Sequence, residues 1–120
     1  MDNKHVVKVD RRSYDFLSGV LGTSGFYAGY KGNHIFKTFS VDLGEGLEVD
    51  INVVNGEDPY INAVLYDHGV EMLTLDPTHE LLGDYAFEHF GEQYVVSLEL
   101  EMPVVKEKEK KKKVIKKQKG

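Results

Sequence analysis

From residue 35 onward, apolar side chains recur at every second position, which is the period of a β-strand with one buried face. Residues 35–43 follow this period with an interruption at Lys37, and residues 47–53 follow it without a break. A Gly-Glu-Gly turn separates the two runs, and an Asn-Gly turn follows the second. The pattern therefore predicts strands at 35–43 and 47–53, of which the second is the clearest half-buried strand in the chain.

Three further strand-like runs lie between residues 60 and 102. Residues 60–66 are apolar on both parities, which is typical of a central strand, and residues 70–75 return as their hairpin partner after an Asp-His-Gly turn. Asp76-Pro77 ends that hairpin because proline cannot donate to a strand ladder. The last run, 93–102, predicts a long strand with inward-facing Tyr94, Val96, Leu98, Leu100 and Met102, and water-facing Gln93, Ser97, Glu99 and Glu101.

Residues 78–90 fit two different structures. As a helix they would carry an apolar stripe, with a capping residue at 76 or 78 and a glycine stop at 91. Gly83 argues against the helix, since glycine costs about 1 kcal/mol in a helix interior. Tyr85 and Phe87 alternate with polar neighbours, and the Gly-Glu pair at 91–92 suits a hairpin turn. We therefore favour a strand that forms a hairpin with 93–102, and the helix is the alternative.

The N-terminal part carries weaker signals. Residues 5–9 are a short β-prone run and predict an edge strand. Residues 13–22 predict one short helix, with Ser13 as the cap, apolar residues at spacings of three and four, and Gly22 after the last turn. Residues 22–33 interleave glycines with Phe26, Tyr27 and Tyr30. Such a segment is a wide connection whose aromatic side chains either fold back onto the core or form a contact loop.

Six or seven short strands, with turns about every ten residues, predict an all-β domain. We expect a small antiparallel sandwich or barrel, with room for one short N-terminal helix. The acidic β-domain would span residues 1–105. Residues 106–120 form a basic, low-complexity tail that cannot bury enough apolar surface to order itself alone.

Charge divides the chain sharply. Residues 38–105 contain no lysine or arginine and fifteen carboxylates. Residues 1–105 hold 6 Lys/Arg and 18 Asp/Glu, a net charge of −12, whereas residues 106–120 hold 9 Lys and 2 Glu, a net charge of +7. Uncompensated charge of one sign costs stability through self-repulsion. The asymmetry therefore indicates interaction surfaces more than it indicates a fold.

The outward positions of 47–53 and 93–102 are largely acidic, so Glu48, Asp50, Glu99 and Glu101 would share a sheet face if these strands are neighbours. Ordinary solubilising charge is the alternative explanation. We favour a non-enzymatic binding or inhibitory module that presents this acidic face to a basic protein partner. The candidate partner-binding residues are six carboxylates and three aromatic anchors: Asp42, Glu45, Glu48, Asp50, Glu99, Glu101, Phe26, Tyr27 and Tyr30.

The tail supports a second function. The domain would then be a scaffold or an oligomer subunit, and the lysines would bind nucleic acid or another polyanion through phosphate attraction. The tail has no arginine and no aromatic residue, so base readout and base stacking are not expected. The same lysines would alternatively clamp onto the acidic domain of their own or a neighbouring chain. The candidate polyanion-binding residues are Lys110, Lys111, Lys112, Lys113, Lys116 and Lys117.

The sequence lacks the residues that several kinds of chemistry require. The absence of cysteine excludes disulfides and thiol nucleophiles. No serine lies in a G-x-S-x-G motif, and the histidines form no H-x-H or H-E-x-x-H pair. The carboxylates between residues 42 and 50 lack the spacing of a calcium loop. We therefore expect no enzyme activity, no metal site and no cofactor.

The N-terminal residues and the length of the apolar runs bear on the location of the protein. The N-terminus has no apolar run behind its charges, and no stretch approaches eighteen consecutive apolar residues. We expect neither a signal peptide nor a membrane span. A cytoplasmic location follows, which the lack of disulfides also favours.

Overall fold

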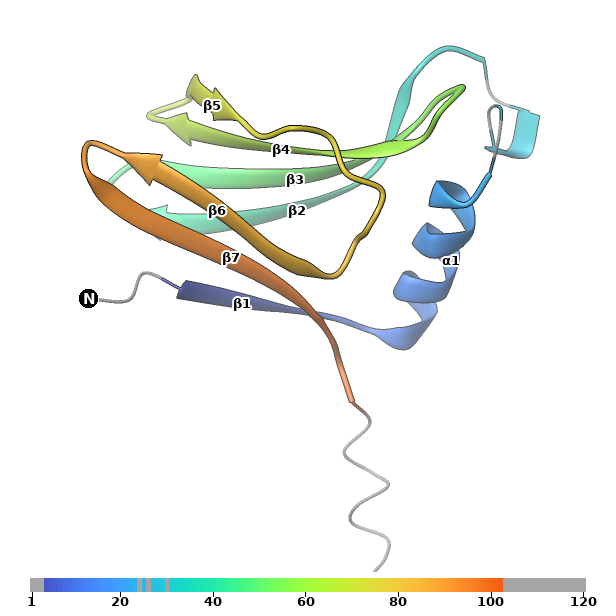
Figure 1. The fold of residues 1–120 in the computed structure, drawn as a ribbon, viewed down its shortest axis with the longest axis horizontal. Helices are drawn as coiled ribbons and strands as arrows, with labels where there is room; N and C mark the ends of the chain where they lie inside the picture. Colours follow the sequence, from blue (N-terminus) through green and yellow to red (C-terminus); the bar gives the residue numbers. More distant parts are fainter. Residues whose placement is uncertain (1–3, 24, 26, 30, 103–120) are drawn as a thin grey trace, which may run out of the picture.

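The structure, a computed structural model, describes residues 4–23, 25, 27–29 and 31–102. Within these residues the chain forms two β-sheets and one short α-helix (Figure 1), which confirms the predicted small all-β sandwich. The three-stranded sheet has the order β1-β7-β6, and the four-stranded sheet has the order β2-β3-β4-β5. The elements are β1 (Lys4–Val9), α1 (Arg11–Leu21), the 3₁₀ turn η1 (Tyr27–Gly29), β2 (His34–Gly44), β3 (Leu47–Asn55), β4 (Tyr60–Asp67), β5 (Val70–Thr74), β6 (Gly83–His89) and β7 (Glu92–Leu100).

β3 and β4 form the centre of the four-stranded sheet, as their hydrophobic patterns predict. In β3, Val49 and Ile51 are fully buried while Glu48 between its apolar neighbours is exposed. In β4, Ala63, Val64 and Leu65 are all buried. Every strand pair in this sheet is antiparallel, and β2–β3 and β4–β5 are tight hairpins. Side chains of one parity therefore face the core, and those of the other parity form the outer face of the sheet.

The segment 78–90 contains a strand, not a helix. β6 pairs antiparallel with β7 from Gly83 opposite Leu98 to His89 opposite Glu92. Tyr85 and Phe87 are buried, and their neighbours Asp84 and Glu88 are exposed. The alternation of polar and apolar residues was therefore the correct signal, and the hairpin prediction is confirmed.

β1 is an edge strand, as predicted, and it runs parallel to β7. Their register extends from Lys4 opposite Val95 to Val9 opposite Leu100. The backbone N–H of Glu101 continues the pairing by donating to the carbonyl of Val9 over 2.8 Å. The first and last strands of the described chain therefore lie side by side, and β7 is the middle strand of its sheet.

Two predictions about exposure in 93–102 are wrong. Ser97 was expected to face water, but only 2 % of it is exposed. On the outer face of the middle strand it is flanked by Val6 and Asp84, and its hydroxyl donates to the Asp84 carboxylate. Met102 was expected to face inwards, but 67 % of it is exposed, because β7 ends at Leu100.

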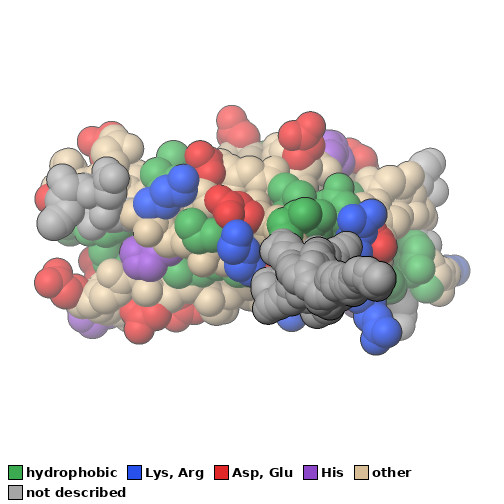
Figure 2. All heavy atoms as spheres, turned by 90° about the horizontal axis from the view of Figure 1, so that it is seen from below, with side chains coloured by type: hydrophobic (Ala, Val, Ile, Leu, Met, Phe, Trp, Pro, Cys, Tyr) green, Lys and Arg blue, Asp and Glu red, His purple; other side chains and the backbone are tan. Residues whose placement is uncertain are grey.

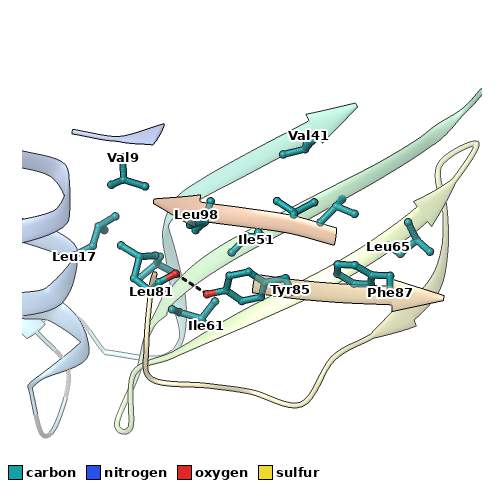
Figure 3. Close-up of a cluster of buried hydrophobic side chains, with 14 of the residues drawn as sticks. Val9, Leu17, Val41, Ile51, Ile61, Leu65, Leu81, Tyr85, Phe87 and Leu98 are labelled. Carbon is teal, nitrogen blue, oxygen red and sulfur yellow. Dashed lines mark hydrogen bonds between the residues drawn. The ribbon is translucent and has the colours of Figure 1, made fainter. Parts of the chain in front are cut away.

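The core lies between the two sheets (Figure 3). Val49, Ile51 and Leu65 of the four-stranded sheet meet Phe87 and Leu98 of the other sheet. Tyr85 is also buried, and its hydroxyl donates to the backbone carbonyl of Leu81 over 2.8 Å, which closes the loop before β6. Burial raises the pKa of Tyr85 to about 12.

α1 packs across one end of the sandwich (Figure 1) and buries Leu17 and Val20. The predicted cap, Ser13, is wrong. The helix begins at Arg11, and its N-cap is Asp10, whose carboxylate accepts from the backbone N–H of Ser13 over 2.8 Å. Among the described residues, no helix is long and apolar enough to cross a membrane.

β2 departs from the predicted alternation at its start. Ile35 was expected to share a face with Val41, but it is 60 % exposed while Val41 is buried. A register shift between Ile35 and Lys37 inserts one residue into the strand. Such a bulge reverses which face each preceding side chain occupies.

Candidate interaction surface

The outer face of the four-stranded sheet is built from three cross-strand rows of side chains. Alternate residues of these strands are buried in the core, so the residues between them project away from it. The register places polar residues opposite one another in the first row and brings carboxylates into the other two. The rows are Thr38–Asn52–Asn62, Ser40–Asp50–Val64–Thr74 and Asp42–Glu48–Tyr66–Glu71.

Four carboxylates of these rows, Asp42, Glu48, Asp50 and Glu71, are called the acidic face below. Three of the four are predicted partner-binding residues, and the structure brings these three together on β2 and β3. Glu71 was not predicted, because its place beside Tyr66 depends on a bulge in the β4–β5 pairing. The predicted hairpin of β4 with β5 is the sequence signal that would have placed Glu71 near this face.

The acidic face holds its carboxylates with neutral donors. Ser40 donates to Asp50 over 2.9 Å, and Thr74 donates to Glu71 over 2.7 Å. The backbone N–H of Gly44 donates to Asp42 over 2.9 Å. Within the described part of the chain, no salt bridge reaches any of the four carboxylates. Among the described residues, the four carboxylates are therefore left without an ion pair.

Mutual repulsion on the acidic face shows in the acidities of its residues. A hydrogen bond with Asp50 and the charge of that carboxylate raise the pKa of Glu48, and the charge of Asp42 adds to the shift. Partial burial raises the pKa of Tyr66, and the charges of Asp50, Glu71 and Glu48 act in the same direction. The surrounding negative charge thus makes ionisation of Glu48 and Tyr66 less favourable. A cation bound beside them would reduce this repulsion.

Glu99 and Glu101 do not belong to this face. β7 lies in the other sheet, so the predicted common surface of these residues with Glu48 and Asp50 does not form. Glu99 is also neutralised, because Lys8 Nζ lies 2.9 Å from Glu99 Oε1. The side of the molecule seen from below Figure 1 carries Lys and Arg side chains interspersed with carboxylates (Figure 2).

Glu45 occupies the turn between β2 and β3, one step beyond the last row of the acidic face. It is exposed and its backbone has a left-handed φ of 55°. It therefore belongs to the end of the sandwich that carries the hairpin turns.

Tyr27 lies at the opposite end, in a cluster of three aromatic rings. Its ring centroid is 5.8 Å from that of Phe16 in α1 and 6.1 Å from that of Phe36 in β2. Asn55, fully buried, fixes Tyr27 in place: its side-chain oxygen accepts from Tyr27 N over 2.9 Å, and its amide donates to Tyr27 O over 3.2 Å. Phe36 and Asp42 are six residues apart along β2, about 20 Å of strand. Tyr27 is therefore not part of the acidic face.

Several predicted residues lie outside the described part of the chain. These are two of the aromatic anchors and all six candidate lysines of the tail: Phe26, Tyr30, Lys110, Lys111, Lys112, Lys113, Lys116 and Lys117.

Three histidines lie beside carboxylates, and only one of these carboxylates is the neighbour of its histidine in the sequence. His68 Nδ1 lies 2.6 Å from its neighbour Asp67, but His89 Nε2 lies 3.2 Å from the same carboxylate, twenty-two residues away. His79 is 3.4 Å from Asp58. Across the residues that the structure describes, no group of three or more His, Cys, Asp or Glu side chains is arranged to hold a metal ion.

Comparisons with protein-family models, with curated proteins and with solved structures found no match to this chain. Its function must therefore be argued from its own residues.

Proposed function

We propose that this protein is a non-enzymatic binding or inhibitory module, and that the acidic face docks a basic segment of a protein partner. The observation that carries the proposal is the arrangement of Asp42, Glu48, Asp50 and Glu71 on one sheet face, where no described salt bridge reaches them. The acidic residue Glu99 on the other sheet, by contrast, has its own lysine.

The physical reason is the free energy stored in this arrangement. Like charges on neighbouring strands repel one another, and cross-strand pairs of like charge are destabilising. A lysine- or arginine-rich segment would remove that repulsion and form charge-assisted hydrogen bonds with the same oxygens. Such complementarity accelerates encounter and makes binding sensitive to salt.

The neutral residues of the face suit a polar, flat contact. Thr38 donates to Asn52 over 2.7 Å, and Asn52 donates to Asn62 over 3.5 Å, so amide and hydroxyl groups continue the face beyond the carboxylates. Tyr66 sits between Glu48 and Glu71 and offers an amphipathic ring. A partner that uses its basic surface to bind nucleic acid would be inhibited when that surface is covered, since regularly spaced carboxylates compete with phosphates.

The test compares the binding of octalysine to two double variants of the full chain that have the same net charge. Glu48→Gln with Asp50→Asn removes two charges from the acidic face, and Glu88→Gln with Glu99→Gln removes two charges from the outer face of the other sheet. We expect octalysine to bind the wild-type chain at low salt and to weaken at high salt. The acidic-face variant should lose affinity and salt dependence, and the control should keep both. Equal losses in the two variants would show that only net charge matters.

A second function rests on the tail, which holds nine lysines in residues 106–120. The domain would then be a scaffold or oligomer subunit, and the tail would bind nucleic acid or another polyanion. Replacing Lys110, Lys111, Lys112 and Lys113 with serine tests this function without shortening the chain. Loss of RNA and DNA binding at low salt would support the tail as the functional element, and unchanged binding would reject it.

A further inference from the structure

Three two-residue hairpin turns gather at the end of the sandwich opposite α1 (Figure 1). They are Glu45-Gly46 between β2 and β3, His68-Gly69 between β4 and β5, and Phe90-Gly91 between β6 and β7. The first residue of each turn has a left-handed φ of 55°, 51° and 51° respectively, and the glycines follow at 84°, 85° and 78°. This is the pattern of the type I′ turn, which matches the twist of the flanking strands.

Two of the three residues at the first position of these turns, Glu45 and Phe90, are unusual. Type I′ turns strongly favour Asn, Asp or Gly there, and His is also enriched at positive φ, whereas Glu and Phe are strained. Here the positions hold Glu, His and Phe. Phe90 is 87 % exposed, so burial of its ring in the core does not offset the strain. His68 and Phe90 do make local contacts, since His68 Nδ1 lies 2.6 Å from Asp67 and the Phe90 ring centroid lies 4.3 Å from that of His89. Both side chains nevertheless stay largely exposed, and strained residues of this kind cluster at functional sites.

All three side chains border one cavity. Glu45, His68 and Phe90 line a hollow of about 290 Å³, together with Leu47, Asp67, His89, Glu92 and Tyr94. The cavity therefore lies where the turns of both sheets meet. Loops collected at one end of a β-sandwich form a binding site in other sandwich proteins, since a rigid scaffold positions them.

Contacts between the turns hold the cavity in shape. The Asp67 carboxylate lies 2.6 Å from His68 Nδ1 and 3.2 Å from His89 Nε2, so it connects a turn of one sheet with β6 of the other. His89 is nearly buried, with 10 % of its side chain exposed. The backbone N–H of His68 donates to the carbonyl of Gly46 over 2.8 Å. A site fixed in this way pays little ordering cost when it binds a ligand.

The lining of the cavity selects a cation with an apolar stem. Glu45 and Glu92 contribute carboxylates, and Phe90 and Tyr94 contribute aromatic rings. Asp67 adds negative charge, although its two oxygens already contact His68 and His89. No lysine or arginine of the described residues borders the cavity. An ammonium or guanidinium group is attracted by carboxylates and by the faces of aromatic rings. The alkyl stem of lysine or arginine packs against the same rings.

We propose that this cavity, the turn pocket, receives a single lysine or arginine side chain of the basic partner segment. The turn pocket adjoins the acidic face, because Asp67 follows Tyr66 in β4 and pairs with Leu47 in the next row. A basic segment lying along Asp50 and Glu48 reaches the pocket at the end of the same strands. The inference rests on the proposed function, in that the ligand is a basic side chain of the same partner.

The first test is a nuclear magnetic resonance titration of the full chain with N-acetyl-lysine methylamide and N-acetyl-arginine methylamide. We expect the backbone amide signals of Glu45, His68 and Phe90 to shift in a saturable way. N-acetyl-norleucine methylamide, which keeps the stem and lacks the charge, is the control and should leave these signals in place. Equal shifts with norleucine, or no shifts with either cation, would overturn the proposal.

The second test uses Phe90→Asn. Asparagine is favoured at this position of a type I′ turn, so the variant should fold with an unfolding temperature equal to or above that of the wild type. Removing the aromatic wall should weaken binding of N-acetyl-lysine methylamide by about fivefold. Unchanged affinity in a folded Phe90→Asn variant would contradict the proposal.

Failure of the turn pocket and failure of the acidic face give different results. If octalysine binding depends on Glu48 and Asp50 but the turn signals stay still, the turn pocket is refuted and the proposed function stands. If the lysine methylamide shifts the turn signals but Glu48→Gln with Asp50→Asn leaves the affinity for octalysine unchanged, the acidic face is refuted and the pocket stands.

Discussion

Lys8 Nζ lies 2.9 Å from Glu99 Oε1 and joins the parallel strands β1 and β7 on the outer face of the three-stranded sheet. This ion pair changes the meaning of the lysine-free segment 38–105. The basic residue that compensates Glu99 comes from the first strand of the chain, more than ninety positions earlier. Within the described part of the chain, Glu99 therefore has an ion-pair partner and Glu48 has none.

The contrast predicts opposite effects of two matched substitutions on stability. Glu99→Gln removes an attractive contact and should lower the free energy of unfolding at pH 7 by less than about 1 kcal/mol, as for other exposed ion pairs. Glu48→Gln removes a repelled charge and should raise it. Thermal unfolding at low salt measures both, and equal signs for the two variants would contradict the charge distribution described above.

The gain from Glu48→Gln should also depend on pH. The folded-state pKa of Glu48 is raised above its ordinary value of 4.5, so ionisation favours the unfolded chain. Ionisation of this carboxyl therefore lowers the stability of the wild type as the pH rises from 4.5 through the folded-state pKa, and the variant lacks this contribution. The difference should be small at pH 3, where the carboxyl is protonated in both states, and larger at pH 7. A difference independent of pH would show that ionisation is not its cause.

Asp67 should behave in the opposite sense. Its hydrogen bonds with His68 and then His89 lower the pKa of the carboxyl below its ordinary value of 3.8. A carboxylate with a depressed pKa contributes stability that is present above the unfolded value and is lost as the pH falls through the folded one. Asp67→Asn should therefore lower the unfolding temperature at pH 6, with the deficit shrinking below about pH 4.

The connection between the sheets at Asp67 is checked by a double-mutant cycle. In a His89→Gln background, Asp67→Asn should cost less than it does in the wild type, because one of its two partners is already gone. Additive effects of the two substitutions would show that the Asp67–His89 contact does not stabilise the fold.

Much of this architecture is predictable from local patterns. The alternation in 47–53 and the turn at 67–69 predict β3 and the β4–β5 hairpin, because each depends on residues close in sequence. The parallel pairing of β1 with β7 is not predictable in this way, since it joins the two ends of the described chain. The acidic face was predicted only in part for the same reason, because Glu99 and Glu101 were placed on it and Glu71 was not. Parity predicts that Glu48 and Glu99 point outwards, but it does not say which sheet each strand joins.

Gly46 and Gly69 offer a matched pair for testing the contact between turns. Both have left-handed φ, 84° and 85°, so alanine is strained at either position, by about 1–2 kcal/mol. A Cβ at Gly46 would also lie 2.4 Å from the His68 ring, whereas a Cβ at Gly69 meets open space. Gly46→Ala should therefore lower the unfolding temperature more than Gly69→Ala. Adding His68→Asn should remove the difference, and a persistent difference would refute the contact.

Asn55 should be more important for stability than its place beside a turn suggests. The fully buried amide is bonded to both backbone groups of Tyr27, so Asn55→Ala leaves the partly buried N–H and C=O of Tyr27 without these partners. Such a loss costs about 1–3 kcal/mol per unsatisfied group. Asn52→Ala, at a half-buried amide on the outer face, is the control and should cost less. Chemical denaturation measures both, and a cost for Asn55→Ala no larger than that of the control would contradict this role.

The central claim is that a basic segment docks on the outer face of the four-stranded sheet. The most direct measurement is a nuclear magnetic resonance map of octalysine bound to the full chain at low salt. We predict that the backbone amide signals of Glu48, Asp50, Tyr66 and Glu71 shift on binding and return when salt is added. Shifts centred instead on Lys8, Glu88 and Glu99, or spread evenly over both sheets, would contradict the claim.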